Sequence, residues 1–369
     1  MTIKRGVSLY SYQQTQFFNI KDVWAQIQEV RQGLDADGIE IISEQAIRGY
    51  PFPSCDFVER WHEVMAHYKT RAVTYDAHLD VLQFRDHVMD ADEATDRLKR
   101  DIRIASKLGF GIVRTHSSIS LDLHIRALPL AESLGIRLAK EVHAPMSLTG
   151  PDVAEIVEHC EKTGCKSLGF VPDFGIFQVR INQPTADWYE RNGCRPETIA
   201  FAQSLCDDRV VDHLGHSERS FASHQYFVGY VLKNVEPPAQ FAKGIYEYVA
   251  ICKENVPNPT PLDWDLLGWP LRLPRSTGEE LEALVPYIAS CHAKFYDMTE
   301  IRGKPGQYED KAVDYETAIE ALKRGGFDGY VNSENEGQRH YQDLDVEFYQ
   351  DEVEQARRHH EMLKRLIGI

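Results

Sequence analysis

Four acidic or imidazole side chains lie at or near the ends of apolar segments. Glu141 follows LGIRLAK, Asp173 follows SLGFVP, His292 lies in SCHAKF and Glu334 follows GYVNS. Carboxylate oxygens with one imidazole nitrogen suit a divalent ion, and carboxylates sharing a pocket without a cation would repel one another. The four residues therefore predict a site for one divalent ion. Oxygen-rich ligation favours Mn²⁺ or Mg²⁺ and leaves Zn²⁺, Co²⁺ and Fe²⁺ open.

Each of these residues has a plainer explanation when it is taken alone. A single Glu or Asp at the end of a strand is more often a helix N-cap or a surface residue. The joint placement favours the ion, because four such groups close four consecutive predicted strands. Glu336, two positions after Glu334, is the alternative fourth ligand. Glu334 is preferred because it directly ends the apolar strand.

A histidine and a lysine accompany the predicted ligands at a spacing of two residues. His143 follows Glu141 and Lys294 follows His292, so in extended chain each points to the same side as its ligand. A neutral imidazole beside the ion is suited to take a proton from a carbon or hydroxyl that the cation makes acidic. A histidine satisfied by its neighbours at the rim is an equal alternative. Lys294 is placed to orient a carboxylate or a substrate oxygen.

Several other polar residues have weaker patterns. His116 ends RTH, and Asp76 and His78 lie in TYDAHLD, also at strand ends. They are candidates for the lining of a pocket, with surface or capping roles favoured. The closing stretch, 346–369, is typical of an amphipathic helix, and we expect its histidines, His359 and His360, to face solvent.

The elements that must position these residues follow a regular alternation. Helical patterns that end in glycine are followed by short apolar strands several times, as in SKLGFGIVRTH and KRGGFDGYVNSE. Eight candidate strands fall within 6–10, 37–43, 70–75, 106–116, 136–140, 161–173, 287–295 and 323–334. Eight alternating units predict a (β/α)₈ TIM barrel, whose active site lies at the carboxyl ends of the strands. A doubly wound open sheet is the competing fold, but no GxGxxG follows the first strand.

One connection in this pattern is far longer than the others. More than 100 residues separate the strand that ends at Asp173 from the strand that begins near Tyr287. We expect a single TIM-barrel domain over 1–369 with an inserted helical or loop subdomain at about 176–278, between strands six and seven. The insertion is rich in Trp and Tyr, and a lid, a partner surface or an extra packed helical layer are its alternatives.

Composition excludes several classes of protein. The net charge of −16 opposes binding to a phosphate backbone, so no nucleic-acid partner is expected. The start of the chain lacks a signal peptide and no apolar run is long enough to span a membrane, which predicts a cytoplasmic protein without a membrane role. Seven cysteines form no CxxC pair and are expected to be reduced.

The strand ends LGIRLAKEVH, SLGFVPD, SCHAKF and GYVNSENEG resemble, in order and spacing, those of the xylose-isomerase-like barrel superfamily. This superfamily includes sugar-phosphate isomerases and epimerases and the endonuclease IV group. The resemblance implies the same ligand set, Glu141, Asp173, His292 and Glu334. Many relatives have a histidine three positions after the aspartate, where this chain has Ile176, so a multi-metal site is not expected.

Within that superfamily the chain looks most like the large α subunit of bacterial C-glycoside deglycosidases. The resemblance rests on its length, the EVH pairing, DFGIF, SCHAKF and the bulky insertion. It implies a lyase that uses Mn²⁺, works with a small β subunit in a hetero-oligomer, and splits 3-oxo-glucosides of plant aromatics. His143 would be the base, with His116, Lys294 and Glu336 near the substrate. A stand-alone sugar isomerase or epimerase and a non-catalytic binding module are the alternatives.

Overall fold

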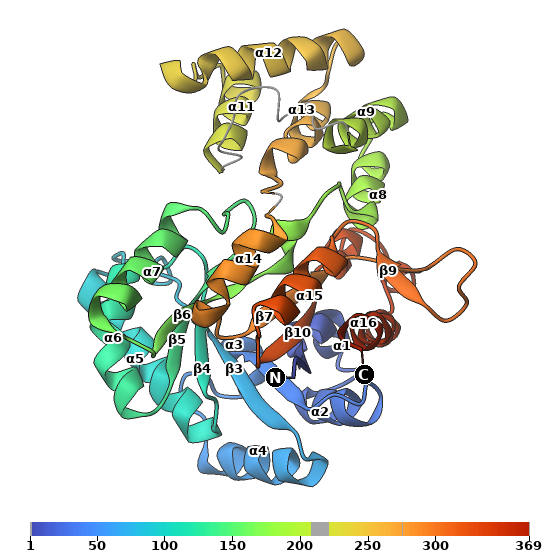
Figure 1. The fold of residues 1–369 in the computed structure, drawn as a ribbon. Helices are drawn as coiled ribbons and strands as arrows, with labels where there is room; N and C mark the ends of the chain where they lie inside the picture. The colour runs from blue at the N-terminus through green and yellow to red at the C-terminus, as the bar shows by residue number, and fades with distance from the viewer. Residues whose placement is uncertain (1, 208–220, 275, 369) are drawn as a thin grey trace.

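Eight parallel strands form the centre of the molecule in the computed structural model, which describes residues 2–207, 221–274 and 276–368 (Figure 1). The strands are β1 (Lys4–Ser8), β2 (Gly38–Ile42), β3 (Arg71–Ala77), β4 (Ile112–Thr115), β5 (Arg137–Val142), β6 (Leu168–Pro172), β7 (Cys291–Phe295) and β10 (Tyr330–Asn335). Each corresponds to one of the eight predicted strands. The predicted TIM barrel is therefore confirmed.

The barrel is nearly closed. Its strands follow the order β6-β5-β4-β3-β2-β1-β10-β7, and all seven neighbouring pairs are parallel. At the seam between β6 and β7 the pairing is reduced to two isolated bridges, Phe170 with Ile288 and Asp173 with His292. The seam therefore runs directly past two of the predicted ion ligands.

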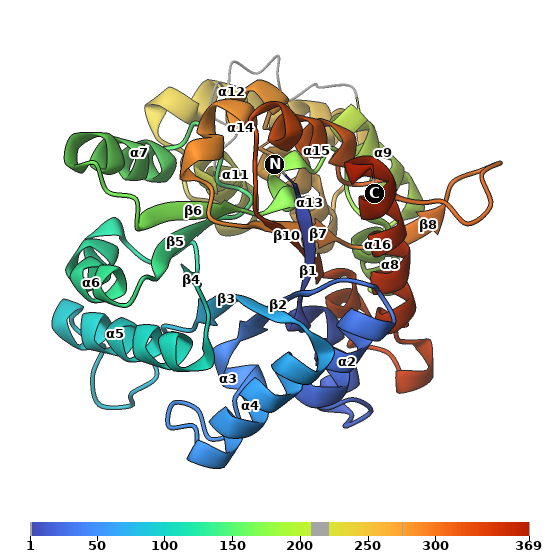
Figure 2. The same cartoon turned by 60° about the horizontal axis from the view of Figure 1, so that its bottom comes forward.

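Helices surround the barrel as an outer layer (Figure 2). They are α2 (Val23–Gln32), α4 (Cys55–Tyr68), α5 (Ala91–Leu108), α6 (Leu121–Ser133), α7 (Pro151–Thr163), α14 (Gly278–Leu284), α15 (Tyr315–Arg324) and α16 (Glu352–Ile367). Short helical turns are α1 (Gln13–Phe17), α3 (Ser43–Ala46), η1 (Leu9–Tyr12), η2 (Phe174–Phe177), η4 (Val285–Tyr287), η5 (Gly337–Tyr341) and η6 (Val346–Phe348). In the described part of the chain, no helix is both long enough and apolar enough to cross a bilayer.

Local sequence signals explain where these helices begin and end. Asp90 caps α5 by accepting from the backbone N–H of Glu93, whose side chain accepts in return from the Asp90 N–H. The helix stops at Gly109, whose φ of +83° is a left-handed conformation that glycine adopts without strain. Gly164 ends α7 in the same way at φ +71°. These two glycines, which the sequence placed after helices, therefore act as C-caps.

The long connection between β6 and β7 contains α8 (Gln183–Arg191), α9 (Pro196–Asp207), α11 (Phe221–Lys233), α12 (Ala239–Asn255), α13 (Pro261–Leu267) and η3 (Trp269–Arg272). These helices gather at one end of the barrel (Figure 1). They enclose an apolar cluster of their own, around Phe227, Tyr248 and Trp264. The predicted insertion at 176–278 covers this segment, though 208–220 and 275 lie outside the described residues. Its status as a separate subdomain stays a prediction.

Two features differ from the expectations. A short hairpin follows β7, in which β8 (Met298–Glu300) pairs antiparallel with β9 (Tyr308–Asp310), and no sequence pattern had indicated it. His359 and His360 on α16 are 0% and 2% exposed, so the expectation that they face solvent was wrong. Both rings are turned toward the barrel wall, because they find hydrogen-bond partners there.

Candidate functional site

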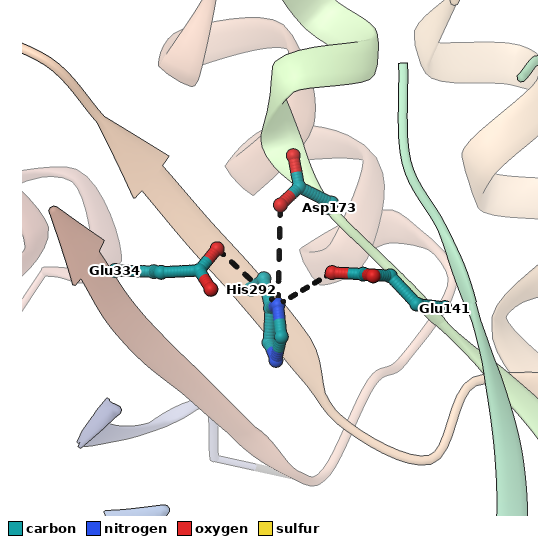
Figure 3. A group of neighbouring side chains, drawn as sticks. All are labelled: Glu141, Asp173, His292 and Glu334. Atoms are coloured by element: carbon teal, nitrogen blue, oxygen red, sulfur yellow. Dashed lines mark ion pairs between the residues drawn. The ribbon is translucent and has the colours of Figure 1, made fainter. Parts of the chain in front are cut away.

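The four predicted ligands meet at the carboxyl ends of their strands. Glu141 lies in β5, Asp173 follows β6, His292 lies in β7 and Glu334 in β10. One ligand atom from each lies within 4.8 Å of all the others, which is close enough for the four to share an ion. Figure 3 shows the three carboxylates pointing at one imidazole from different sides.

The imidazole of His292 is the centre of the group. Its Nδ1 lies 3.1 Å from Glu141 Oε1, 3.3 Å from Glu334 Oε2 and 3.9 Å from Asp173 Oδ2. The four side chains are at most 6% exposed, so water contributes little to their solvation. The predicted set is thus brought together, and its role as a ligand set stays a prediction.

The other nitrogen of His292 faces a carboxylate that the sequence reasoning missed. Glu40, in β2, lies with Oε1 2.9 Å from His292 Nε2, while Asn332 Nδ2 donates to its Oε2 at 2.8 Å. The two atoms have the distance of an ion pair but not the geometry of a hydrogen bond, so Glu40 favours a positive charge on the ring without fixing its tautomer. Glu40 therefore attracts the Nε2 side of the ring, while Nδ1 faces the three carboxylates.

A second group, formed by Glu40, Asp76 and His292, also has spacing suited to a cation. Arg114, in β4, already supplies positive charge there, because its Nε lies 3.2 Å from Asp76 Oδ1 and its Nη2 3.2 Å from Glu141 Oε1. The surface or capping role favoured for Asp76 was wrong, since it is 2% exposed and faces this arginine. Burial raises the pKa of Asp76 well above its ordinary value.

Lys294 lies among the acidic groups as the sequence predicted. Its Nζ is 2.8 Å from Asp173 Oδ2 and 3.2 Å from Glu336 Oε2. Burial opposes the ammonium, but Asp173 and Glu336 outweigh this effect and raise the Lys294 pKa well above its ordinary value. Glu336, the alternative fourth ligand, is not part of the four-residue group and instead pairs with Lys294 and with Arg339 at 3.0 Å.

His143 is turned toward Lys294, at the edge of the group. Its Nε2 lies 2.7 Å from Lys294 Nζ and its Nδ1 lies 2.5 Å from the carbonyl oxygen of Ala144. An ammonium and a carbonyl at these two positions assign the proton to Nδ1 and a lone pair to Nε2. His143 is therefore a neutral imidazole whose Nε2 accepts from Lys294 and whose Nδ1 donates to Ala144.

The remaining predicted residue, His116, is less involved. It is exposed at the end of β4, and its Nδ1 lies 3.0 Å from Ser118 Oγ. Burial of part of the ring lowers its pKa, with Glu141 opposing. The structure brings His116 near the group without a hydrogen bond to any of its members.

The charge balance at this end of the barrel tests whether a cation fits. Six carboxylates gather here: Glu40, Asp76, Glu141, Asp173, Glu334 and Glu336. Among the described residues they face four positive groups, Arg114, Lys294, Arg339 and a protonated His292, and Asp76 can hold a proton because burial raises its pKa. Asp173 Oδ2 and Glu334 Oε2 are also buried without a donor of hydrogen-bond geometry. Unneutralised buried carboxylates are costly, so the donor set fits a divalent ion.

Opposite effects act on the pKa values of the three predicted acidic ligands. Burial would raise all three, but Arg114 outweighs it at Glu141 and His292 outweighs it at Glu334, so both pKa values are lowered. At Asp173 burial prevails and the pKa is raised to about 6. In the ion-free protein, Asp173 is thus the carboxyl of the three that holds a proton most readily.

The affinity for a divalent ion should therefore rise with pH. Asp173 carries a proton below about pH 6, and His292 must release one, because Glu334 and Glu40 raise its pKa against the effect of burial. A cation competes with each of these protons, which strengthens binding about tenfold per pH unit for every proton displaced. Calorimetric titration with MnCl₂ from pH 5 to pH 8 measures this slope. An affinity that does not change with pH would contradict the ligand set.

A pocket of about 480 Å³ lies beside the group. None of the four predicted ligands lines it, but His143 and Glu336, each two residues from one of them, do, together with Tyr296. The connection between β6 and β7 contributes two indole rings to the lining, Trp188 and Trp269. The pocket thus combines polar groups next to the candidate ion site with aromatic rings, which suits a ligand with one polar and one aromatic half.

The comparison with solved structures establishes the class of fold. An L-ribulose 3-epimerase matches with a TM-score of 0.51 at 11% identity, covering 100% of this chain and 95% of that one. A D-psicose 3-epimerase matches with a TM-score of 0.50 at 12% identity, covering 99% of each. The chain has the xylose-isomerase-like TIM-barrel fold, as predicted.

Sequence comparison narrows the resemblance to one group of proteins. The chain is 26% identical over 366 residues to the 3'-dehydrocarminate deglycosidase alpha subunit of Microbacterium sp, covering 98% of this chain and 95% of the relative. It is 27% identical over 365 residues to the C-glycoside deglycosidase alpha subunit of Arthrobacter globiformis, covering 99% and 92%. No family model matches. The predicted resemblance to C-glycoside deglycosidase α subunits is confirmed.

Proposed function

We propose that this chain is the metal-dependent catalytic subunit of an enzyme that splits the bond between sugar and aglycone in 3-oxo-glucosides. The observation that carries the proposal is the group of Glu141, Asp173, His292 and Glu334, with the neutral His143 beside it. The full-length similarity to deglycosidase α subunits supports the substrate class and an enzyme that acts on sugars. Mn²⁺ is the proposed ion, held by these four residues.

The ion would polarise the 3-keto group of the sugar and make the neighbouring C2–H acidic. His143, whose ring lines the pocket, would then take the C2 proton at Nε2 in place of the hydrogen bond from Lys294. As the C1–C2 double bond forms, the bond from C1 to the aglycone breaks and the aglycone carbon takes up a proton. The products are an unsaturated keto sugar and the protonated aglycone, and no water is consumed.

Lys294 and Ala144 would assist His143 in opposite phases of this reaction. The Ala144 carbonyl holds the Nδ1 proton and fixes the ring, so the base is oriented before substrate binds. Once His143 is protonated, it lies 2.7 Å from the Lys294 ammonium. Repulsion between the two cations would favour passing the proton on to the departing aglycone.

The aromatic wall of the pocket would hold the aglycone. Trp269 Nε1 donates to Tyr189 Oη at 3.2 Å, and that hydroxyl donates to Asp265. These bonds fix the rings of Trp269 and Tyr189 in place, so an aromatic ligand can stack on them at little entropic cost. A planar aglycone in this half of the pocket would leave the sugar over the ion site.

A partner subunit is also proposed, because the relatives are α subunits and the chain has an extensive exposed apolar surface. Nine of the fifteen exposed large apolar side chains of the described part lie on loops that follow β10, β1, β2 and β3, which are neighbours in the sheet. They are Phe17, Phe18, Ile20, Phe52, Leu82, Phe84, Val88, Val346 and Phe348. The ring contact between Phe18 and Tyr349 and the bond from Gln16 to the Gln45 carbonyl join the loops that follow β10, β1 and β2. Segment 342–351 adds four acids and no base, so we propose a small β subunit with an apolar, basic face.

The test is incubation of the protein with a 3-oxo C-glucoside and MnCl₂, with and without a co-purifying small subunit. We expect release of free aglycone and an unsaturated keto sugar in equal amounts, and loss of both after chelation. A free 3-keto sugar is the control substrate. Conversion of that sugar to an epimer or isomer without aglycone release from the glucoside would replace the proposal by a stand-alone epimerase or isomerase.

A further inference from the structure

Two consecutive histidines on α16 are enclosed between the helix and the barrel wall. His359 and His360 contact neither the pocket nor the four-residue group, yet both are fully hydrogen-bonded. Burial of a polar ring is unfavourable unless its nitrogens find partners. Their partners form a continuous hydrogen-bond chain across five elements, which begins at Arg5 and ends at Lys294.

The first half of this chain runs from β1 to β10. Arg5 Nη1 lies 2.9 Å from His360 Nδ1, and His360 Nε2 lies 2.9 Å from Ser333 Oγ. Arg5 also donates from Nη1 to the carbonyl of Leu34 at 3.1 Å, which anchors its guanidinium. The chain therefore starts from a cation that is fixed in place.

The second half runs from β10 to β7. Ser333 Oγ lies 2.8 Å from His359 Nδ1, His359 Nε2 lies 2.8 Å from Tyr315 Oη, and Tyr315 donates to the carbonyl oxygen of Lys294 at 2.6 Å. The His359 ring also stacks on Phe295, with centroids 4.2 Å apart and 17° between the planes. The chain thus ends on the strand that carries His292 and Lys294.

The two ends fix the direction of every bond between them. A guanidinium can only donate and a backbone carbonyl can only accept. His360 must therefore accept at Nδ1 and donate from Nε2 to Ser333, which donates to His359 Nδ1. His359 in turn donates from Nε2 to Tyr315. For two neutral histidines, any other assignment leaves one link without a proton or places two donors face to face.

Burial favours the neutral form of both histidines, and the proton of each is then on Nε2. Burial lowers the pKa of His359 to about 3 and, together with Arg5, lowers that of His360 well below its ordinary value. The chain cannot deliver protons to the site, because it ends at a backbone carbonyl that has none to pass on. Its effect must be on the position of the strands.

The Lys294 carbonyl lies at a weak point of the barrel. Carbonyls alternate in direction along a strand, and the Phe295 carbonyl accepts from Glu336 N after β10 at 2.9 Å. The Lys294 carbonyl therefore faces the β6 side, where the described pairing stops at the bridge between Asp173 and His292. Tyr315 supplies the hydrogen bond that a neighbouring strand supplies elsewhere.

We propose that the Arg5–Lys294 hydrogen-bond chain positions Lys294 and Glu334 at the candidate ion site. Ser333 and Phe295, which the chain holds from outside, are each adjacent to one of these inward-facing residues. Side chains alternate across a strand, so fixing the outer residue fixes the rotation of the inner one. Tyr315, His359 and His360 are positioning residues. This inference rests on the proposed function only for the role that it assigns to Lys294 and Glu334.

The test compares two tyrosine variants that lose the same kind of bond. Tyr315→Phe removes the hydroxyl that donates to the Lys294 carbonyl, and Tyr248→Phe removes one that donates to the Leu267 carbonyl at 2.7 Å, in the connection between β6 and β7. Both variants should melt at lower temperature. We expect Mn²⁺ affinity, measured by calorimetry, to fall about tenfold in Tyr315→Phe, which is the smaller end of the effect of losing a group that orients a metal ligand. It should be unchanged in Tyr248→Phe.

A second pair of variants separates the effect of hydrogen-bond direction at position 359 from the effect of side-chain packing there. Glutamine at position 359 can accept from Ser333 and donate to Tyr315, so His359→Gln should keep the Mn²⁺ affinity that His359→Leu loses. In the wild-type protein, ¹⁵N NMR should find the proton on Nε2 of both histidines. A proton on Nδ1, or equal Mn²⁺ affinity in Tyr315→Phe and Tyr248→Phe, would overturn the proposal.

If the wild-type protein binds no Mn²⁺, the proposed function is refuted. A crystal structure of Tyr315→Phe then tests this inference separately. In Tyr315→Phe, the distances from Lys294 Nζ to His143 Nε2 and Glu336 Oε2, 2.7 Å and 3.2 Å in the wild type, should lengthen. If both are retained, the chain does not position Lys294.

Discussion

Replacing Glu141 by glutamine should leave a folded protein that retains no divalent ion and has lost its activity. The substitution keeps the shape of the side chain but removes the charge that lies 3.1 Å from His292 Nδ1 and 3.2 Å from Arg114 Nη2. Losing the ion removes several kcal/mol of stabilisation of the charge in the transition state, which corresponds to a rate that is about a thousandfold lower. Metal content per chain by elemental analysis and aglycone release from a 3-oxo C-glucoside are the two measurements.

Glu352→Gln is the matched control for this prediction. Glu352 is 2% exposed and accepts from the backbone N–H groups of Gln14 and Thr15, at 2.9 Å and 2.8 Å, far from the ion site. Its substitution should lower stability by about 1–3 kcal/mol through weakened hydrogen bonds and leave the ion in place. Equal loss of ion in both variants would indicate a general effect on the fold. Full activity of Glu141→Gln would remove Glu141 from the ligand set.

The parts of the site that the sequence predicted share one property, which is position at the end of a strand. Glu141, Asp173, His292 and Glu334 could be found because parallel strands of a barrel bring their carboxyl ends to one rim. The spacing of two residues then predicted that Lys294 lies on the same side as His292, and its Nζ does reach the group. These inferences needed only the strand assignment and the period of two.

The positions of charged residues within strands were harder to predict, because such a side chain can face either the barrel interior or the helix layer. Glu40 and Arg114 interrupt apolar strands and face the barrel interior. Lys140 interrupts one in the same way, yet it is directed to the helix layer, where it pairs with Asp152 on α7. Only the exact register of each strand separates the two cases, and a boundary error of one residue reverses the answer.

The histidines of α16 were wrongly predicted for a related reason. Polar residues on an amphipathic helix are normally assigned to its solvent face. His359 and His360 instead face the barrel, because Arg5, Ser333 and Tyr315 supply partners from three other elements. Partners that are distant in the sequence cannot be recognised from the periodicity of one helix. The same limit applies to the hairpin of β8 and β9, which depends on contacts that Asp310 makes with the Tyr296 and Ala312 amides.

His143→Gln should keep the ion and lose turnover. His143 is not among the four ligands, so the metal content should stay near one per chain, as in the wild type. Glutamine can still donate to the Ala144 carbonyl, but it offers no basic nitrogen to the substrate. Removal of a general base slows a reaction by about 10²- to 10⁴-fold. The exchange of the C2 proton of the sugar with deuterated water should fall by the same factor, because the same step produces it.

His124→Gln controls for the loss of a hydrogen-bonded buried ring. His124 is fully buried on α6 and bonds to Thr115 Oγ1 and to the Ser120 carbonyl, outside the pocket. Its substitution should reduce thermal stability and leave exchange at C2 unchanged. If His143→Gln loses aglycone release but keeps C2 exchange, His143 protonates the leaving group and another residue removes the C2 proton.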